Sequence, residues 1–344
     1  MPTIRSDAAP IPTGVGRIGH EAKRLLRFVP LPLRRHLFYL RHLGTWGNFR
    51  KPTHYNEKVQ WRIINDRRTW LTMACDKLAS KEYAWRIATE QGLPLKIPET
   101  LWVGTDVRAL YALRDRLPAR WVLKPNHSSG RYRLLDANDE EIDWDDLIKA
   151  SDRWMRPDEE TEIRGHFGYV GARKLIIAEE RIGTGSESAT IRFKGGDRGI
   201  ADVGVTVGVH GIGTHKSYTH DNQLRRMPSE RAIGAPMEER SVIETLDPEE
   251  RATLLKIGMA LCAAFDQIRA DLYSADGFWF GEFTAYSASG LYLFGPKRMQ
   301  RWSDNWVLPD LSVADPREPL WRELLAREER GTLQGQALQG HNAR

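Results

Sequence analysis

The sequence predicts an α+β protein whose functional face is one surface of an antiparallel sheet. Three observations support this fold class. The chain of 344 residues is longer than most single domains, which predicts two or three lobes. Residues 267–290 alternate polar and apolar side chains around an Asp-Gly pair and predict a β-hairpin. Directly before them, residues 248–266 repeat apolar side chains at helical spacing.

The predicted hairpin turns at Asp276-Gly277, a pair typical of a type I′ turn. Side chains alternate along a strand, so one face of the hairpin would carry four cross-strand pairs. These are Ala275 with Phe278, Tyr273 with Phe280, Asp271 with Glu282, and Arg269 with Thr284. The other face suits a core and consists of Ile268, Ala270, Leu272, Trp279, Gly281 and Phe283. The prediction is a sheet with a buried back and a polar front.

The opposed pair Asp271 and Glu282 predicts a cation site. Cβ atoms of opposed residues lie about 4.5–5.5 Å apart, and two carboxylates that close repel each other unless a cation lies between them. Oxygen ligands favour a hard ion such as Mg²⁺ over zinc. Arg269 would add a fixed positive charge for an anion. The alternative is a half-exposed hairpin in which Arg269 simply neutralises Asp271, and the pattern alone does not choose between the two.

Composition and charge narrow the class of protein. The net charge of +5 is mildly basic and fits an anionic ligand such as a nucleotide, an acidic polymer or a membrane surface. The two cysteines, Cys75 and Cys262, lie in helix-like apolar contexts, which predicts a reducing compartment and no disulfide framework. The sequence has no apolar run long enough to span a bilayer, and its N-terminus lacks the apolar segment of a signal peptide. We expect a soluble cytoplasmic protein.

The N-terminal region is basic. Residues 1–20 are rich in Pro and Gly, and we expect them to be loose. Residues 21–45 place Leu33, Leu37 and Leu40 at helical spacing, with arginines elsewhere. This pattern predicts a helix docked on the body of the protein. The alternative is a basic helix lying on an anionic membrane.

Two further helices and a strand are expected next. The motif NEKVQW at residues 56–61 opens one helix. Asp76 is a suitable N-cap for another helix, which would begin at Lys77 and stop at Gly92. Residues 97–104 then predict a strand.

Residues 120–131, RWVLKPNHSSGR, predict a phosphate-binding element. A short apolar strand at residues 121–123 delivers Lys124 to a polar loop of small residues. Such a loop can wrap its backbone N–H groups around phosphates while Lys124 adds a point charge. The GxxxxGK[ST] pattern of a P-loop is absent. The alternative is an ordinary turn after an edge strand, in which His127 is a surface residue rather than a phosphate contact.

The rest of the chain alternates strands, helices and loops. The expected elements are a surface helix within residues 136–158, a strand at 174–182 that ends in two acids, a strand at 187–193, a Gly- and His-rich acceptor-binding loop at 195–236, the helix at 248–266 capped by Asp247, a polar helix at 316–330 and a disordered tail. His210, His215 and His220 recur in the loop without the spacing of metal ligands.

Six motifs in order resemble the ATP-grasp superfamily, in which two α+β lobes with antiparallel sheets hold ATP between them. The resemblance is closest to the TupA-like branch of bacterial surface-polymer biosynthesis, and it covers about residues 30–300. The motifs are NEKVQW at 56–61, DK at 76–77, VLKPNHSSG at 122–130, AEE at 178–180, RADLY at 269–273 and GEFT…SG at 281–290. Each motif is weak alone, and their shared order makes the resemblance specific.

The resemblance implies a role for each matching residue. Lys77 and Lys124 correspond to the lysines that touch the ATP phosphates, and the covering loop corresponds to Asn126, His127, Ser128, Ser129 and Gly130. The hinge whose backbone reads adenine corresponds to Glu179, Glu180 and Ile182, and Glu187 corresponds to a ribose contact. The ligands of Mg²⁺ (or Mn²⁺) correspond to Asp271, Glu282 and Thr284. Arg269 corresponds to the residue that stabilises the transferring phosphoryl group or the tetrahedral intermediate.

Three positions depart from the family pattern. Thr284 stands where most ATP-grasp ligases have Asn, and Ser128 stands where relatives often have Gly. The strand at residues 188–195 lacks the D-Y-K that relatives often carry there. These departures are compatible with a different acceptor.

The resemblance implies an ATP- and Mg²⁺-dependent ligase that joins a carboxylate to an amine through an acyl phosphate, in surface polysaccharide or peptide-polymer biosynthesis. The implied partners are ATP, a carboxylate and an amine, with no nucleic acid. No general base is evident, and the three loop histidines are the candidates. The alternatives are an ATP-grasp kinase or a sugar transferase of the same pathway, and a non-catalytic polymer-binding adaptor.

We expect the chain to divide into five segments. They are a basic helical region at 1–50, an α/β part at 51–118, a first ATP-grasp lobe with the phosphate loop at 119–182, a second lobe with the metal-binding hairpin at 183–308, and a C-terminal helix with a disordered tail at 309–344.

Overall fold

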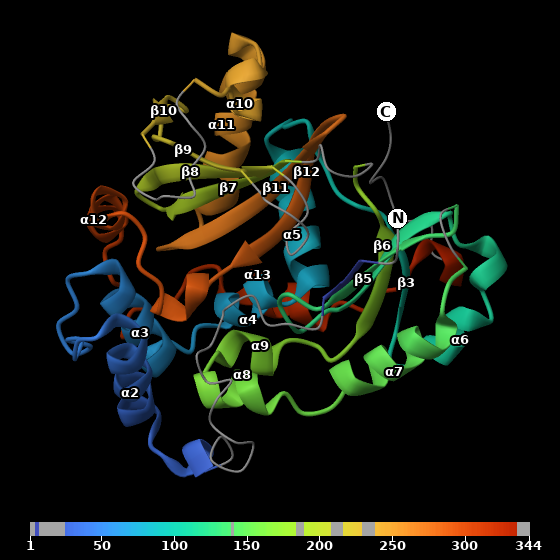
Figure 1. Ribbon diagram of the computed structural model, residues 1–344, viewed down its shortest axis with the longest axis horizontal. Helices are drawn as coiled ribbons and strands as arrows, with labels where there is room; N and C mark the ends of the chain where they lie inside the picture. The colour runs from blue at the N-terminus through green and yellow to red at the C-terminus, as the bar shows by residue number, and fades with distance from the viewer. Residues whose placement is uncertain are drawn as a thin grey trace.

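The computed structural model describes residues 4–6, 25–138, 141–183, 189–207, 216–228 and 238–335. Two mainly antiparallel sheets, with helices packed between and around them, make up these residues (Figure 1). This arrangement confirms the α+β class. Within the described part of the chain, no helix is long and apolar enough to cross a membrane.

The smaller sheet has five strands in the order β1-β5-β4-β6-β3, all paired antiparallel. Its strands are β1 (Ile4–Ser6), β3 (Thr100–Gly104), β4 (Arg120–Pro125), β5 (Tyr132–Asp136) and β6 (Ile176–Glu180). The sheet includes both β3 and β4, so the boundary expected at residue 118 falls inside it. Residues 4–6 were expected to be loose, and pairing with β5 makes them a strand instead.

Helices cover one side of the smaller sheet. They are α6 (Val107–Tyr111), η3 (Arg114–Arg116) and α7 (Trp144–Trp154), and Figure 1 shows α6 and α7 together along this sheet. Trp121 and Leu123 alternate along β4 and pack on this side against Leu147 of α7. Lys124 belongs to the opposite face of the same strand, because side chains alternate.

The larger sheet has seven strands in the order β10-β9-β8-β7-β11-β12-β2. Its strands are β2 (Leu95–Lys96), β7 (Ala189–Gly196), β8 (Gly199–Val207), β9 (Lys216–His220), β10 (Arg226–Met227), β11 (Ile268–Ala275) and β12 (Gly277–Thr284). Only β2 pairs parallel among the described strands. The expected loop at 195–236 is therefore wrong for β8, β9 and β10. These three strands make up one side of the seven-stranded sheet.

Several helices contribute to the core of the larger sheet. Among them are α3 (Tyr55–Asn65), α4 (Thr69–Cys75), α5 (Lys77–Glu90), α11 (Pro248–Cys262) and α13 (Glu318–Ala326). The predicted start of α11 is confirmed, since Asp247 accepts a hydrogen bond from the Glu250 amide at 2.8 Å. Gly258 lets α11 approach the sheet closely, because a Cβ there would lie 2.3 Å from the Phe193 ring. The expected polar helix, α13, instead buries Trp321 and Leu324 in this core.

The predicted cap of α5 is also confirmed. Asp76 accepts a hydrogen bond from the Ala79 amide at 2.9 Å, and its carboxylate accepts a second bond from Arg173 at 2.7 Å. The helix ends at Glu90, two residues before Gly92, which has a φ of +61°. The Asp76 cap therefore fixes Lys77 at the start of α5. Through Arg173, it also ties this end of the helix to the segment that leads into β6.

Short elements complete the fold. They are η2 (Leu26–Phe28), α2 (Leu31–Leu43), α8 (Glu159–Arg164), α9 (Phe167–Gly171), α10 (Val242–Thr245), η4 (Ser287–Gly290), α12 (Pro296–Asn305) and η5 (Thr332–Gln334). The expected disordered tail is wrong for η5, because Gln334 donates to the Val103 carbonyl at 2.8 Å and accepts from its amide at 3.0 Å. Residues 336–344 lie outside the described residues.

Candidate active site

The hairpin of β11 and β12 brings the predicted polar pairs together. Asp271 lies opposite Glu282, and Arg269 lies opposite Thr284. The back of the hairpin is buried as predicted at Ile268, Ala270, Leu272 and Phe283. The register at the site is therefore the one predicted from the Asp-Gly turn.

Nearer the turn the predicted register is wrong. Ala275 pairs with Gly277, so the connection is tighter than the predicted type I′ turn, and Tyr273 pairs with Trp279 instead of Phe280. A β-bulge at Gly281 absorbs the one-residue difference before Glu282. Phe280 consequently belongs to the buried face, opposite Leu272. Gly281 fits there because a Cβ would lie 2.9 Å from the Asp271 carbonyl oxygen.

Two rows of residues cross strands β8, β7, β11 and β12 on one face of the larger sheet, which we call the front face. The first row, in that strand order, consists of Asp202, Lys194, Arg269 and Thr284. The second row consists of Gly204, Arg192, Asp271 and Glu282. Residues paired across antiparallel strands share a face, so these side chains are neighbours. The front face is rich in charge, while Phe193 between the two β7 cations is fully buried on the other side.

Arg269 lies between the two carboxylates of the hairpin. Its guanidinium contacts Asp271 through two bonds, Nε–Oδ1 at 2.6 Å and Nη2–Oδ2 at 2.7 Å, and Nη2 lies 3.8 Å from Glu282 Oε1. Burial disfavours the charged guanidinium, but the two carboxylates outweigh burial and raise the pKa of Arg269. Arg192 Nε also lies 3.7 Å from Asp271. Arg269 does neutralise Asp271 in this structure, as the alternative interpretation of the hairpin required.

The front face nevertheless fits a hard divalent cation. Its donor set would be the carboxylates of Asp271 and Glu282 and the hydroxyl of Thr284. Thr284 Oγ1 is buried, and within the described residues it neither accepts nor donates a hydrogen bond. It is therefore an oxygen available to a ligand. Those residues contain no cluster of three or more His, Cys, Asp or Glu side chains that could hold a metal ion. Two carboxylates still suffice for Mg²⁺, which commonly completes its shell with water and substrate phosphates.

The loop after β4 is held firmly against the body of the protein. Asn126 is fully buried, accepts a hydrogen bond from the Leu78 amide at 3.0 Å and donates to the Arg173 carbonyl at 2.9 Å. His127 is buried as well, and its Nε2 lies 3.1 Å from the Trp154 carbonyl oxygen. Burial lowers the pKa of His127. Both side chains thus anchor the loop, and His127 is not the surface residue of the alternative interpretation.

The small residues of the loop lie closer to the front face. The hydroxyl of Ser129 hydrogen-bonds to the side chain of Tyr169 from α9. Ser128 is buried, and its Oγ has no hydrogen-bond partner in the described part of the chain. Gly130 has a φ of +75°, a backbone conformation that favours glycine. The Lys77 ammonium donates to the Ser128 carbonyl, which ties the start of α5 to this loop.

Glu179 lies between two lysines. It forms an ion pair with Lys124 from the neighbouring strand β4, and Lys81 Nζ lies 3.3 Å from its other oxygen. Lys81 also donates to the Thr100 hydroxyl at 2.8 Å. Burial alone would raise the pKa of Glu179, but the two ammonium groups outweigh burial and lower it. Two lysines, Lys81 and Lys124, therefore share a single carboxylate.

The expected adenine hinge begins where β6 ends. The Glu180 amide donates to the Glu99 carbonyl at 2.9 Å, and the Glu180 carboxylate accepts from the Glu99 amide at 3.1 Å. Both groups are thus occupied within the protein. Ile182 follows the strand and is half-buried. Glu187, the expected ribose contact, lies outside the described residues.

Electrostatics place the lysines beside the front face. Burial lowers the pKa of Lys77, the Glu282 carboxylate opposes that shift, and the Lys124 ammonium adds to it. Burial raises the pKa of Tyr273, and the carboxylates of Glu282 and Glu179 raise it further. Lys77 of α5 and Glu179 of the smaller sheet thus interact electrostatically with the hairpin of the larger sheet.

The histidine candidates for a general base do not converge there. His220 is fully buried in β9, with Nε2 2.9 Å from the Ser241 hydroxyl, and burial lowers its pKa to about 4. It is an internal residue rather than a loop residue. His210 and His215 lie outside the described residues.

A family model, described as TupA-like ATPgrasp, matches residues 57–307, which is well over half of the chain. This chain belongs to the TupA-like ATP-grasp family. The match contains five of the six motifs in full and all but the first residue of NEKVQW, together with every strand of the two sheets except β1. The resemblance inferred from the sequence is thereby confirmed, and no curated protein matches the chain.

Solved ATP-grasp structures are distant relatives of this family member. The ATP-grasp ligase PsnB with its minimal precursor has 15% identity and a TM-score of 0.30, covering 72% of this chain and 59% of that one. D-alanine–D-alanine ligase from Helicobacter pylori has 13% identity and a TM-score of 0.37, covering 69% and 62%. L-amino acid ligase from Bacillus licheniformis has 14% identity and a TM-score of 0.36, and the match covers 79% of this chain and 56% of that one. This TupA-like chain thus spans about three fifths of the neighbours' lengths, and these likenesses assign no residue a role.

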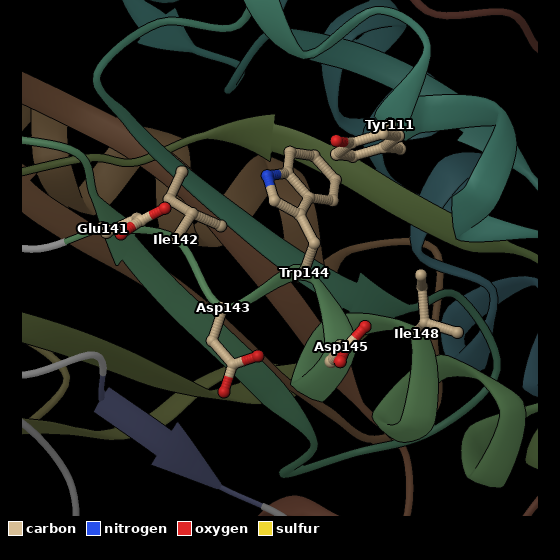
Figure 2. A pocket seen from close by; sticks show the side chains of 7 residues that line it. All are labelled: Tyr111, Glu141, Ile142, Asp143, Trp144, Asp145 and Ile148. Atoms are coloured by element: carbon tan, nitrogen blue, oxygen red, sulfur yellow. The ribbon is translucent and has the colours of Figure 1, made fainter.

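A separate cavity of about 520 Å³ opens beside the start of α7. Figure 2 shows that it is lined by Tyr111, Glu141, Ile142, Asp143, Trp144, Asp145 and Ile148. Asp143 caps α7 by accepting from the Asp146 amide at 3.0 Å, and Trp144 packs edge-on against Tyr111. This cavity contains none of the predicted site residues of the TupA-like protein.

The sequence analysis missed three cations that the fold adds to the site. Arg192 and Lys194 flank the buried Phe193, and that period-2 alternation indicates a shared polar face. Lys81 lies one helical turn after Lys77 on α5, so their i,i+4 spacing indicates that both face the same side. Neither signal identifies the carboxylates that Arg192 and Lys81 meet.

Proposed function

We propose that this chain is an ATP- and Mg²⁺-dependent ligase that joins a carboxylate to an amine. Its place would be the biosynthesis of a bacterial surface polysaccharide or peptide polymer, in the cytoplasm where ATP is available. The observation that carries the proposal is the front-face group of Arg269, Asp271, Glu282 and Thr284, next to the lysines around Glu179. Membership of an ATP-grasp family supports ATP as the ligand.

In this proposal the two sheets are the lobes that hold ATP. Lys77 and Lys124 would bind the phosphates, because Lys81 and Lys124 share one carboxylate and therefore carry an excess of positive charge. Lys124 would exchange Glu179 for a phosphate oxygen, while Lys81 keeps Glu179 neutralised. The chain after β6, around Ile182, would lie against the adenine. The anchored loop at residues 126–131 would cover the phosphates and exclude water.

Asp271, Glu282 and Thr284 would hold Mg²⁺, or Mn²⁺ in its place. The ion would supply positive charge that offsets the negative charge developing during phosphoryl transfer. Arg269, which contacts Asp271, would turn toward the anion once the metal neutralises that carboxylate. Thr284 Oγ1 would gain the partner that it lacks in this structure.

Two steps would then form the product. A substrate carboxylate oxygen attacks the γ-phosphorus of ATP, the bond to the β,γ-bridging oxygen breaks, and ADP leaves. The amine attacks the resulting acyl phosphate, phosphate leaves with the electron pair of the broken C–O bond, and the amine nitrogen releases a proton. Arg269 would stabilise the oxyanion of the second step.

The test is isothermal titration calorimetry with ATP, in the presence and absence of Mg²⁺. We expect Mg²⁺-dependent binding in the wild type and binding at least about tenfold weaker in the double variant Asp271→Asn/Glu282→Gln. Asp276→Asn is the matched control, since Asp276 lies at the exposed tip of the same hairpin and pairs with Lys96. Equal binding by wild type and double variant would rule out the hairpin as the metal site. Absence of ATP binding in the wild type would favour the non-catalytic adaptor.

Product analysis separates the ligase from the kinase. A ligase releases ADP and inorganic phosphate only when a carboxylate and an amine are both present. A kinase releases ADP with one acceptor and leaves the phosphate on that acceptor. Screening acceptors for release of ADP and phosphate together therefore decides between these two ATP-grasp activities.

A further inference from the structure

Helix α2 docks on the body of the protein through arginine as well as aromatic side chains, since its buried residues are Arg34, Arg35, Phe38 and Tyr39. A docked helix normally buries its apolar stripe and exposes its polar residues. Here Arg34 and Arg35 point inward. Arg35 is fully buried and donates to the Gln60 side chain at 2.7 Å and to the Ser289 carbonyl at 2.8 Å. The helix is docked on the body, as the sequence predicts, but partly through its arginines.

The outward side of α2 is apolar. Leu33, Leu37 and Leu40 are 46%, 41% and 44% exposed, although they repeat at the spacing of one helix face. We call these three residues, with Phe28 and Trp46, the leucine face. Phe28 in η2 is 72% exposed and Trp46 after α2 is 55% exposed.

Trp46 belongs to this face through a ring contact. It stacks on His36 with ring centroids 4.5 Å apart, and His36 lies on α2 between Leu33 and Leu40 in helical register. Phe28 precedes the N-terminal end of the helix. Large apolar side chains thus extend from η2 along α2 to the loop beyond it, and Figure 1 shows these elements at one end of the molecule. Contiguous exposed apolar surface of this kind marks an interaction site.

The chain segment that carries the leucine face has charges of one sign. Residues 22–56 contain eight lysines and arginines and no aspartate or glutamate: Lys23, Arg24, Arg27, Arg34, Arg35, Arg41, Arg50 and Lys51. Four of them, Arg27, Arg41, Arg50 and Lys51, are exposed in the structure. Exposed leucines and aromatic residues flanked by arginines and lysines are the composition of a helix that lies in a membrane interface.

We propose that the leucine face binds the surface of an anionic lipid bilayer. The leucines, Phe28 and Trp46 would enter the boundary between headgroups and acyl chains, and the exposed arginines and lysine would contact the headgroup phosphates. The buried bonds of Arg35 hold α2 on the protein in this orientation, so the body would be carried to the membrane by a preformed surface. The inference does not depend on the ligase proposal, because none of these residues belongs to the front face.

The neighbouring acids indicate which end of the face carries the charge. Helix α8, with exposed Glu159, Glu160 and Glu162, packs beside η2, and Arg34 donates to the Glu162 carbonyl at 3.4 Å. The basic residues past the other end of α2, Arg50 and Lys51, are remote in sequence from these acids. We therefore expect the C-terminal end of the face to contribute most of the electrostatic attraction.

The experiment is co-sedimentation of the full-length chain with vesicles. Phosphatidylglycerol–phosphatidylcholine vesicles are compared with phosphatidylcholine alone, at low and high salt. We expect binding to the anionic vesicles, weakened by salt because surface charges are screened. Leu33→Ser/Leu37→Ser/Leu40→Ser should weaken binding at least about tenfold. Arg50→Gln/Lys51→Gln should weaken it about fivefold per charge.

The matched control is Val307→Ser/Leu311→Ser/Val313→Ser, three exposed apolar residues elsewhere on the surface. It should bind anionic vesicles like the wild type. Thermal melts of every variant verify folding, and the Arg50/Lys51 variant keeps the test valid if the leucine variant unfolds. The proposal is wrong if the wild type binds neither vesicle or if the folded variants bind like the wild type. It is also wrong if light scattering shows a dimer that the leucine variant dissociates, because a second copy would then cover the face.

Discussion

Buried lysines on the two sheets have different surroundings. Beside the smaller sheet, Lys81 and Lys124 share the carboxylate of Glu179. On the larger sheet, Lys194 lies opposite Arg269, and its ammonium donates to the Tyr55 hydroxyl. The rings of Tyr55 and Trp302 lie 4.2 Å and 4.3 Å from Lys194 Nζ. Within the described residues no carboxylate accepts a hydrogen bond from Lys194.

The difference teaches what keeps a buried lysine charged. Burial lowers the pKa of Lys81, but Glu179 opposes the shift. Burial lowers the pKa of Lys194 well below its ordinary value, and the Arg269 charge lowers it further. Asp202 would oppose that shift, yet its carboxylate bonds to Arg298. Partly buried lysines with a shared carboxylate suit phosphate binding, whereas Lys194 meets the conditions for a neutral amine.

Removing the shared carboxylate should have the largest effect on stability. Glu179→Ala leaves two buried ammonium groups without their acceptor, and we expect the free energy of unfolding to fall by about 3–5 kcal/mol. Urea denaturation measures this change. Glu323→Ala is the control, because Glu323 is exposed and pairs with Arg86, so its loss should cost less than about 1 kcal/mol. Equal losses in the two variants would contradict the account of the Glu179 cluster.

The Lys194→Met variant tests the surroundings of Lys194 through the pH dependence of the free energy of unfolding. A lysine whose pKa is lowered in the folded state binds fewer protons there than in the unfolded chain, so wild-type stability rises with pH up to the unfolded pKa near 10.5. The Lys194→Met variant lacks this pH-dependent contribution to stability. We expect it to be more stable than wild type at pH 7, with a gap that shrinks by up to about 1.4 kcal/mol per pH unit as pH rises.

Urea denaturation from pH 7 to 9.5 follows this gap, and Lys96→Met, at an exposed lysine of the same sheet, serves as the control. Tyr55 keeps a hydrogen bond with the Ser287 side chain in the Lys194 variant, so no new orphan group should obscure the result. A gap independent of pH would mean that Lys194 stays charged in the folded protein.

The smallest effect is expected at Thr284, whose buried hydroxyl also lacks a partner. Thr284→Val should stabilise the ligand-free protein by about 1 kcal/mol, because it removes an unsatisfied polar group. The same variant should weaken Mg²⁺-dependent ATP binding if the hydroxyl is a metal ligand. Thr284→Ser should restore binding. Thermal melts of both variants test the expected change in stability, and calorimetry tests the expected change in ATP binding. Unchanged ATP binding in the valine variant would remove Thr284 from the metal site.

The correctly and the wrongly predicted parts of the hairpin show what a local sequence pattern can and cannot predict. Alternation of apolar residues predicts that Asp271 and Glu282 share a face, and the structure confirms it. The same pattern predicts the wrong partner for Tyr273, because a bulge can shift the register without changing which residues are polar. Gly281 signals a bulge only once the close approach of the Asp271 carbonyl is known.

The sequence by itself determined the helix caps, the cross-strand pairs at the front face and the family, because each depends on residues close together or on motifs in fixed order. Only the tertiary structure decided that Lys81 meets Glu179, that His127 points inward to Trp154, and that the leucine face points outward. Periodicity tells which residues share a face. It does not tell which neighbour that face meets, since the pairing of distant segments depends on the packing of the whole chain.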